Sequence, residues 1–305
     1  METASPDKRP KERLLPALVG AGVPHLSGWG EVVSAFPGAV NARHSQGLLV
    51  SLIEETRAMT YLSVCLPALF RKQKKRLVPG ERVRFDGDRL VTEGLVVDLL
   101  GRPAWQGELT LRDVDGWNAS TVPLLRKALL LKGRDGGLLG VLRGGEPRNP
   151  FVARAVKALS EVQRAPSRTV GREALSGLVG LGPGSTPSGD DFIAGVLLGG
   201  EVLRLLRRKE AKAVADRRET MIPWAMVKEG TRVAMDRTND AGKTLLWQAL
   251  QGRFPNYLIE TVRSVSEARG SRDIADAVER AVGRGATSGT DALTGLLFSL
   301  ERSFG

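Results

Sequence analysis

Residues 182–192 have the sequence Gly-Pro-Gly-Ser-Thr-Pro-Ser-Gly-Asp-Asp-Phe and lead directly into the apolar run Ile-Ala-Gly-Val-Leu-Leu. The glycines and prolines at the start of this stretch predict a tight, stiff loop. The apolar run predicts a buried helix, for which Ser188 is a favourable N-cap and Asp191 stands where a capping acid belongs. Because a helix start carries free N–H groups and a partial positive charge, the stretch predicts a loop-to-helix corner that can hold an anion.

The same pattern returns 100 residues later, where Ser288-Gly289-Thr290-Asp291 matches Ser188-Gly189-Asp190-Asp191. In each copy a glycine follows four residues after an aspartate: Gly195 follows Asp191, and Gly295 follows Asp291. Residues four apart lie on the same face of a helix. A glycine inside a helix costs about 1 kcal/mol relative to alanine. Glycines at matching places therefore indicate close approach of another backbone. We predict two paired helices whose N-termini lie side by side.

The composition is that of a globular chain with a basic surface. The 305 residues are 42% hydrophobic and carry a formal net charge of +11, which favours an anionic substrate, an acidic partner subunit or nucleic acid. The basic runs at Arg71–Arg76 and Arg204–Lys209 are not interleaved with aromatic residues, so nucleic acid is the least favoured of the three.

The cysteine content and the distribution of apolar residues bear on the cellular compartment. The single cysteine, Cys65, lies in an apolar run and is interpreted as a core residue. One cysteine excludes an internal disulfide and fits a reducing compartment. Residues 1–11 are polar and lack a signal-peptide core, and no apolar run approaches the ~20 residues of a membrane span. We expect a soluble, cytoplasmic protein with no membrane partner.

Hydrophobic periodicity changes along the chain and predicts an α+β protein. After a flexible tail at residues 1–12, alternation and turn signals predict mostly antiparallel β-structure over residues 13–150, with a helix at Val122–Leu131. Apolar residues at three- and four-residue spacing predict a helical domain over residues 151–305, which carries both corners. The predicted strands fall within Val32–Asn41, Leu48–Ile53, Thr60–Leu66 and Val78–Val97. The predicted helices of the second domain are Phe151–Gln163, Arg172–Val179, Phe192–Arg208, Val214–Met235, Ala241–Leu250, Pro255–Val265, Ile274–Val282 and Asp291–Leu300.

The two corners together predict a ligand site, because they hold more hydroxyls and glycines than helix capping requires. Hydroxyls and the N–H groups of Gly189 and Gly289 can hold a phosphate or carboxylate. The candidate binding residues are Gly184, Ser185, Thr186, Ser188, Gly189, Thr287, Ser288, Gly289 and Thr290. The simpler alternative is a pair of capping boxes on two buried helices.

Three aspartates, Asp190, Asp191 and Asp291, are the candidate catalytic residues. They would repel a bare anion, but they can accept hydrogen bonds from an amide, act as a base toward it, or hold a divalent cation. A ligand with an anionic end and an N–H end satisfies both sets of groups. No cofactor is assigned beyond the divalent-cation alternative.

Other catalytic patterns are disfavoured. No lysine follows the glycines at residues 182–189, so the stretch is not a P-loop. His25 and His44 are interpreted as surface or structural residues, and with one cysteine they make a structural zinc site improbable. The glycine-rich stretch Gly133–Gly145 lacks a fixed phosphate-loop spacing and is interpreted as a turn between elements.

Residues Gly180–Gly195 resemble the signature of the AllH family, which includes a subunit of oxamate carbamoyltransferase. The similarity extends to Ser288–Asp291 with Gly295, to Thr238–Phe254 and, in the first half, to Val33–Asn41, so it spans nearly the whole chain. Arg284-Gly285-Ala286 departs from the pattern, because we expect a more hydroxyl- or histidine-rich approach to the second corner.

The resemblance implies carbamoyl transfer between carbamoyl phosphate and oxamate, as in anaerobic allantoin breakdown, or the reverse reaction of oxalurate with phosphate. It also implies companion subunits. Oxamate has a carboxylate and an amide, so helix N-termini would suit the carboxylate or phosphate, and Asp191 or Asp291 the amide. A non-catalytic scaffold subunit that stabilises a catalytic partner is the competing reading.

Overall fold

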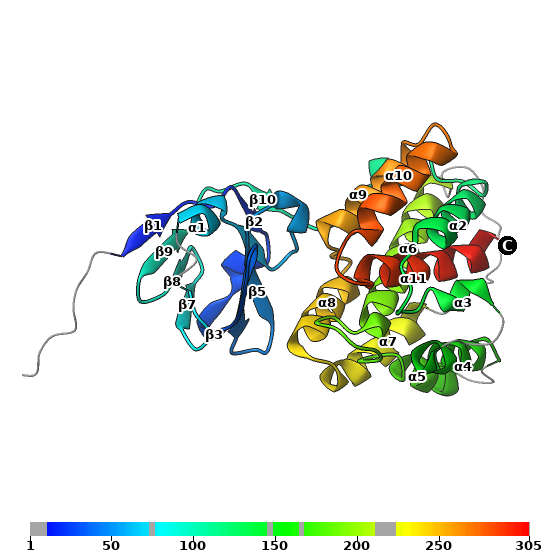
Figure 1. Cartoon of the computed structure of the whole chain (residues 1–305), viewed down its shortest axis with the longest axis horizontal. Coiled ribbons are helices and arrows are strands. Elements are labelled where there is room, and N and C mark those ends of the chain that lie inside the picture. Colours follow the sequence, from blue (N-terminus) through cyan, green and yellow to red (C-terminus); the bar gives the residue numbers. More distant parts are fainter. Residues whose placement is uncertain (1–10, 73–76, 145–148, 165–167, 211–223, 305) are drawn as a thin grey trace, which may run out of the picture. The chain divides into compact units, whose positions relative to one another are not determined.

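The computed structural model describes residues 11–72, 77–144, 149–164, 168–210 and 224–304, and the chain divides into the units Met1–Gly107 and Glu108–Gly305 (Figure 1). We placed the division near residue 150, whereas the structure has it after Gly107. The reason is helix α2 (Thr121–Lys132), which buries Leu125 and Leu129 and packs on α10 (Ser271–Val282) and α11 (Ser288–Phe304) of the second unit. Of the predicted tail, residues 1–10 lie outside the described residues, and Glu12 begins strand β1.

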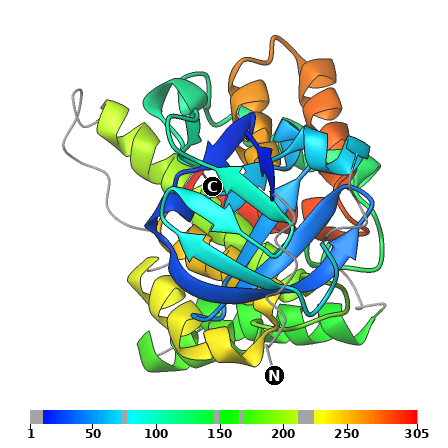
Figure 2. The ribbon, with the colours of Figure 1, turned by 90° about the vertical axis from the view of Figure 1, so that its left-hand side faces the viewer.

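The first unit is one curled, mostly antiparallel sheet of ten strands in the order β1-β9-β8-β7-β3-β4-β5-β6-β2-β10. Figure 2 shows the long strand β3 curving along its length. The strands are β1 (Glu12–Leu14), β2 (Leu18–Gly20), β3 (Ser27–Phe36), β4 (Ala39–His44), β5 (Leu49–Ile53), β6 (Ser63–Cys65), β7 (Arg82–Asp86), β8 (Arg89–Val91), β9 (Leu95–Asp98) and β10 (Ala104–Trp105). The short helices η1 (Val23–His25), η2 (Thr56–Ala58) and α1 (Pro67–Lys72) lie between them.

Alternation along the strands builds the core of this sheet. In β7, Val83 and Phe85 are buried while Arg82, Arg84 and Asp86 are exposed, which is the period-two pattern of a sheet with one covered face. Cys65 is fully buried, as predicted for a core residue. His44 is also buried, and its Nε2 atom lies 2.9 Å from the Ser27 carbonyl oxygen, so it is a structural residue.

The second unit is helical, so the chain is an α+β protein as predicted (Figure 1). Predicted helix Val214–Met235 lies partly outside the described residues, and α7 covers its later part. The remaining elements are η3 (Leu111–Val114), α3 (Gly140–Arg143), α4 (Pro150–Arg164), α5 (Arg168–Ser176), α6 (Ser188–Glu210), α7 (Trp224–Ala234), η4 (Met235–Arg237), α8 (Asp240–Leu250) and α9 (Asn256–Ser266). None of the helices in the described ranges has the length and apolar character that crossing a bilayer requires.

Helices α6 and α11 form the centre of this unit and pack against each other more extensively than any other described pair. Their crossing is reciprocal: a Cβ on Gly195 would overlap the Ala292 carbonyl, and a Cβ on Gly295 would overlap the Phe192 carbonyl. The predicted close approach of two backbones at these glycines is therefore confirmed. Each helix begins at the serine of its Ser-Gly motif, so the crossing sets the two N-termini beside each other.

Candidate functional site at the paired corners

Hydroxyl groups of the two loop-to-helix corners contact each other directly. The Thr186 and Ser288 hydroxyl oxygens lie 3.0 Å apart, and those of Ser188 and Thr287 lie 3.5 Å apart. We call the six residues Thr186, Ser188, Asp191, Thr287, Ser288 and Asp291 the paired corner. Segments 100 residues apart in the sequence thus form one cluster, as the repeated motif predicted.

Each aspartate of the paired corner faces hydroxyls of both segments. Asp191 lies beside the hydroxyls of Ser288 and Thr186, and Asp291 lies beside those of Ser188 and Thr287. The arrangement differs from two separate capping boxes, in which each side chain would serve its own helix. The exchange of partners ties the N-terminus of α6 to that of α11.

Both aspartates are buried and each retains an unpaired oxygen. Asp191 is 3% exposed and Asp291 is fully buried. Asp291 Oδ1 accepts a 2.6 Å hydrogen bond from the Leu138 N–H, but Oδ2 of Asp291 and Oδ2 of Asp191 have no hydrogen-bond partner among the described residues. A buried polar atom without a partner costs about 1–3 kcal/mol and calls for an explanation. A bound group that donates hydrogen bonds would supply one.

Burial dominates the electrostatics of these carboxyl groups. Burial has the largest influence on Asp191 and raises its pKa, and the charge of nearby Asp291 raises it further. Hydrogen bonds from the hydroxyls of Ser288 and Thr186 act in the opposite direction. The net effect raises the pKa of Asp191 to about 8. Burial likewise raises the pKa of Asp291 against the opposing Leu138 N–H bond. Because the charge of Asp291 also raises the pKa of Asp191, ionisation of one carboxyl group disfavours ionisation of the other.

The backbone N–H groups that we assigned to anion binding are already used inside the loops. Gly189 N–H donates to the Leu181 carbonyl at 2.8 Å, and Gly289 N–H donates to the Arg284 carbonyl at 3.3 Å. Both glycines are explained by packing, because a Cβ on either would overlap a carbonyl, that of Leu178 or Ala281. Their predicted direct role in holding a phosphate is therefore not supported by the geometry.

Asp190 and Thr290 occupy matching positions and both brace neighbouring segments. Asp190 accepts hydrogen bonds from the Gly180 N–H at 2.8 Å and from the Thr238 hydroxyl. Burial raises the pKa of Asp190, although these two bonds oppose the effect. Thr290 is fully buried and its hydroxyl accepts from the Arg134 N–H at 3.0 Å. In the described part of the chain, no side-chain oxygen of Asp190 or Thr290 is buried without a partner, which sets these residues apart from Asp191 and Asp291.

The solvent side of the paired corner is polar and accessible. Gly184 and Ser185 are exposed, while Thr186, Thr287 and Ser288 are half-buried. The left-handed backbone of Gly184, with φ of 113°, favours glycine in this loop. The hydroxyls therefore lie between solvent and the two buried carboxyl groups.

Two residues that our sequence reasoning did not select complete the surroundings. Arg284 places its guanidinium carbon 5.8 Å from the centre of the Tyr257 ring, and it forms no ion pair with any described residue. The charges of Asp191, Arg284 and Asp291 all act on Tyr257, whose pKa is raised mainly by burial. Arg284 is the residue at which the sequence departed from the expected pattern, and the departure places a positive charge beside Tyr257.

The glycine-rich stretch that we interpreted as a turn is also part of these surroundings. Leu138 N–H binds Asp291, Arg134 N–H binds Thr290, and a side chain at Gly137 would overlap the Asp291 carboxylate. The only indication of this contact in the sequence is the run of glycines, because glycine allows another group to approach the backbone closely. Its target could not be identified from the sequence, because Asp291 is more than 150 residues away.

The oxygen atoms of the paired corner also bear on the cation alternative. Two carboxylates and four hydroxyls are hard ligands of the type that Mg²⁺ or Ca²⁺ prefers. Within the described ranges, however, no three His, Cys, Asp or Glu side chains are grouped so as to hold a metal ion.

Comparison with known families bears on the same part of the chain. Residues 178–300 match the family described as AllH, oxamate carbamoyltransferase subunit AllH. None of the curated proteins matches the chain, and no solved structure matches it either. The matched segment includes both corners but not Val33–Asn41, where we had also seen a resemblance. The resemblance to the AllH family is therefore confirmed over residues 178–300, the segment that builds the paired corner.

Proposed function

We propose that this chain is a carbamoyltransferase subunit that binds a small, anionic amide at the paired corner, with oxamate or oxalurate as the substrate class. The observation that carries the proposal is the pair of buried carboxylate oxygens, Asp191 Oδ2 and Asp291 Oδ2, that lack partners among the described residues. An amide NH₂ donates two hydrogen bonds and can therefore supply one to each of two acceptor oxygens. The family name attached to residues 178–300 supplies the reaction class.

The surroundings orient such a ligand. In the proposed complex the amide enters between the Thr186 and Ser288 hydroxyls and replaces their mutual hydrogen bond. The carboxylate end stays near the solvent side, where the Arg284 guanidinium has no competing ion pair with a described residue. A charge-assisted hydrogen bond of this kind contributes about 1.5–3 kcal/mol.

The aspartates then have a chemical role. In the forward reaction the oxamate nitrogen attacks the carbonyl carbon of carbamoyl phosphate, a C–N bond forms, and the C–O bond to phosphate breaks. The nitrogen loses one proton, which whichever carboxylate of the Asp191–Asp291 pair is ionised accepts and later passes to phosphate or water. A carboxyl group whose pKa is raised to about 8, as burial does for Asp191, is suited to proton transfer near neutral pH.

Titration calorimetry tests the binding step on the isolated chain, with oxamate, oxalurate and carbamoyl phosphate as separate ligands. We expect measurable heat with at least one of them, and about tenfold or greater loss of affinity in Arg284→Gln. Asp276→Asn, an exposed site on α10, is the matched control. Absence of binding for all three ligands would contradict the proposal.

A scaffold subunit is the second candidate, and one observation favours it. The N–H groups of Gly189 and Gly289 are used within their loops, so the paired corner is held together without a guest. In that case the isolated chain binds none of the three ligands, while a catalytic partner gains thermal stability on mixing with it. The calorimetric experiment separates the two candidates.

A further inference from the structure

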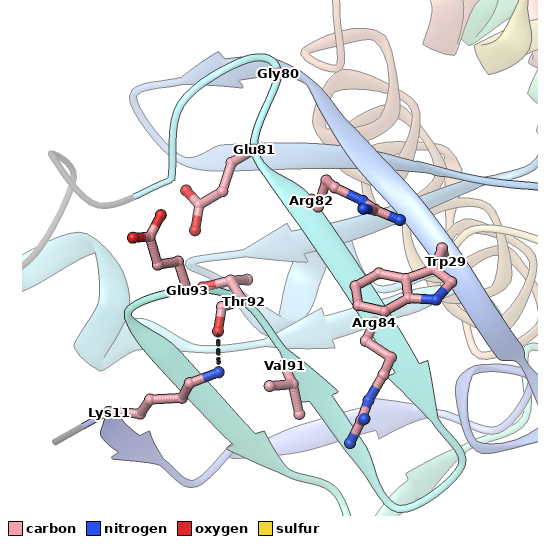
Figure 3. Close-up of a pocket in the computed structure, with 9 residues that line it drawn as sticks. All are labelled: Lys11, Trp29, Gly80, Glu81, Arg82, Arg84, Val91, Thr92 and Glu93. Carbon is pink, nitrogen blue, oxygen red and sulfur yellow. Dashed lines mark hydrogen bonds between the residues drawn. The ribbon is translucent and has the colours of Figure 1, made fainter. Parts of the chain in front are cut away.

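An open groove lies on the outer face of the sheet unit, among residues that the AllH match does not cover. Its volume is about 570 Å³, and β3, β7 and β8 supply much of its lining (Figure 3). Trp29, Arg82 and Arg84 lie on one side and Glu81 and Glu93 on the other. The paired corner contains none of these residues, so the groove needs an explanation of its own.

Trp29 is the anchor of this groove. Its side chain is 48% exposed, and the Arg82 guanidinium carbon lies 4.4 Å from the ring centre. Arg84 pairs with Trp29 in the register of β3 and β7. An indole held by cation–π stacking is already restricted before any partner arrives, which lowers the entropy cost of association. Exposed tryptophan beside arginine is the composition of a protein-interface hot spot.

Both signs of charge line the groove. Lys11 lies on the side of Glu93, where its Nζ donates to the Thr92 carbonyl at 2.8 Å, and Arg84 beside Trp29 is paired with Asp86 at 2.8 Å. Figure 3 shows Glu81, Glu93 and Lys11 on one side of the groove, and the guanidinium groups of Arg82 and Arg84 on either side of Trp29 on the other. Neither Arg82 nor Glu93 forms an ion pair with another described residue. A nucleic acid or an anionic membrane would meet the two glutamates as well as the arginines. Arg82 and Glu93, which have opposite charges and lie on opposite sides of the groove, instead complement a copy of the same surface turned by 180°.

We propose that this groove forms the interface of a two-fold dimer of the chain. The Trp29 indoles of the two copies pack near the axis, and Arg82 of each copy faces Glu93 of the other. The net charge of +11 opposes self-association elsewhere on the surface, whereas the groove pairs its own charges. This inference is independent of the function proposed for the paired corner.

Sedimentation equilibrium of the full chain tests the dimer, over about 1 to 100 μM protein. We expect a monomer–dimer equilibrium whose dissociation constant rises at least about tenfold in Trp29→Ala. Phe36→Ala is the matched control, because Phe36 is 53% exposed on the same strand and does not line the groove. Circular dichroism melting checks that each variant is folded. A monomeric wild-type chain over the whole range, or a dimer that Trp29→Ala leaves unchanged, would overturn the proposal.

A charge exchange identifies the symmetry of the contact. Arg82→Glu and Glu93→Arg should each weaken self-association, because each brings like charges together across the axis. Mixing the two variants creates a heterodimer in which every facing pair is again of opposite charge, so association should return to near the wild-type level. Failure of the mixture to associate better than either variant alone would contradict the two-fold arrangement.

Discussion

At the scale of single residues, the central feature is a pair of buried carboxyl groups that belong to different corners. Asp191 and Asp291 lie under a layer of hydroxyls, and each keeps one oxygen unpaired among the described residues. Asp190 stands next to Asp191 in the sequence, but its carboxylate is bound by Gly180 and Thr238. These adjacent residues therefore differ: both oxygens of Asp190 are hydrogen-bonded within the protein, whereas Oδ2 of Asp191 can still accept a hydrogen bond from a ligand.

The raised pKa of Asp191 makes a prediction about stability. Between about pH 4 and pH 8 the folded chain keeps this carboxyl protonated, while the unfolded chain ionises it. The unfolded state then binds fewer protons, so the free energy of unfolding falls as the pH rises, by at most about 1.4 kcal/mol per pH unit for one group. The contribution of Asp191 to the free energy of unfolding is fully present below pH 4 and is lost by about pH 8. Burial shifts Asp190 and Asp291 in the same direction.

Denaturant unfolding at several pH values measures this effect. Asp191→Asn removes the titrating group, so its stability should depend less on pH over the same window, while exposed Asp276→Asn should keep the wild-type slope. The salt-bridged carboxylates Asp98 and Asp113 have lowered pKa values and lose their contribution only in more acidic solution. An unchanged slope in Asp191→Asn would show that this carboxyl is ionised in the folded chain.

At the scale of the elements, the crossing of α6 and α11 depends on two glycines that approach carbonyls of the opposite helix. We expect Gly195→Ala and Gly295→Ala each to destabilise the chain by about 2–3 kcal/mol, because the added methyl must push the helices apart. The usual gain in helix propensity, about 1 kcal/mol, opposes this loss.

Thermal or denaturant unfolding checks this prediction. Gly270→Ala is the control, because no atom lies within 4 Å of an added Cβ there, and its cost should stay near the 1 kcal/mol of a weakened N-cap. Equal stabilities of Gly195→Ala and Gly270→Ala would mean that the helices tolerate a wider separation than their packing indicates.

The elements also show what the sequence could and could not predict. The repeat at a spacing of 100 residues carried enough local information to predict both helix starts and their pairing. It could not indicate that loop closure would occupy the Gly189 and Gly289 N–H groups. Tyr257, Arg284 and the loop at Arg134–Leu138 reach the paired corner by tertiary packing, and nothing in their own neighbourhoods along the chain indicated that destination.

At the scale of the whole molecule, the paired corner and its surroundings lie entirely within the second compact unit. A fragment of residues 108–305 should therefore fold cooperatively and bind the proposed amide ligand within about threefold of the full chain, because a domain with its own core can fold alone. Circular dichroism and calorimetry on the fragment measure both properties. A folded fragment without binding, beside a full chain that binds, would mean that the sheet unit contributes to the site.

The most direct test of the account is the stoichiometry of oxamate binding to the full chain, measured by titration calorimetry near pH 8. If the two corners share one guest, the titration gives one ligand per chain, and Asp191→Asn and Asp291→Asn each reduce the affinity by at least about tenfold while the variants stay folded. Two ligands per chain, or an affinity that survives both substitutions unchanged, would contradict a shared site.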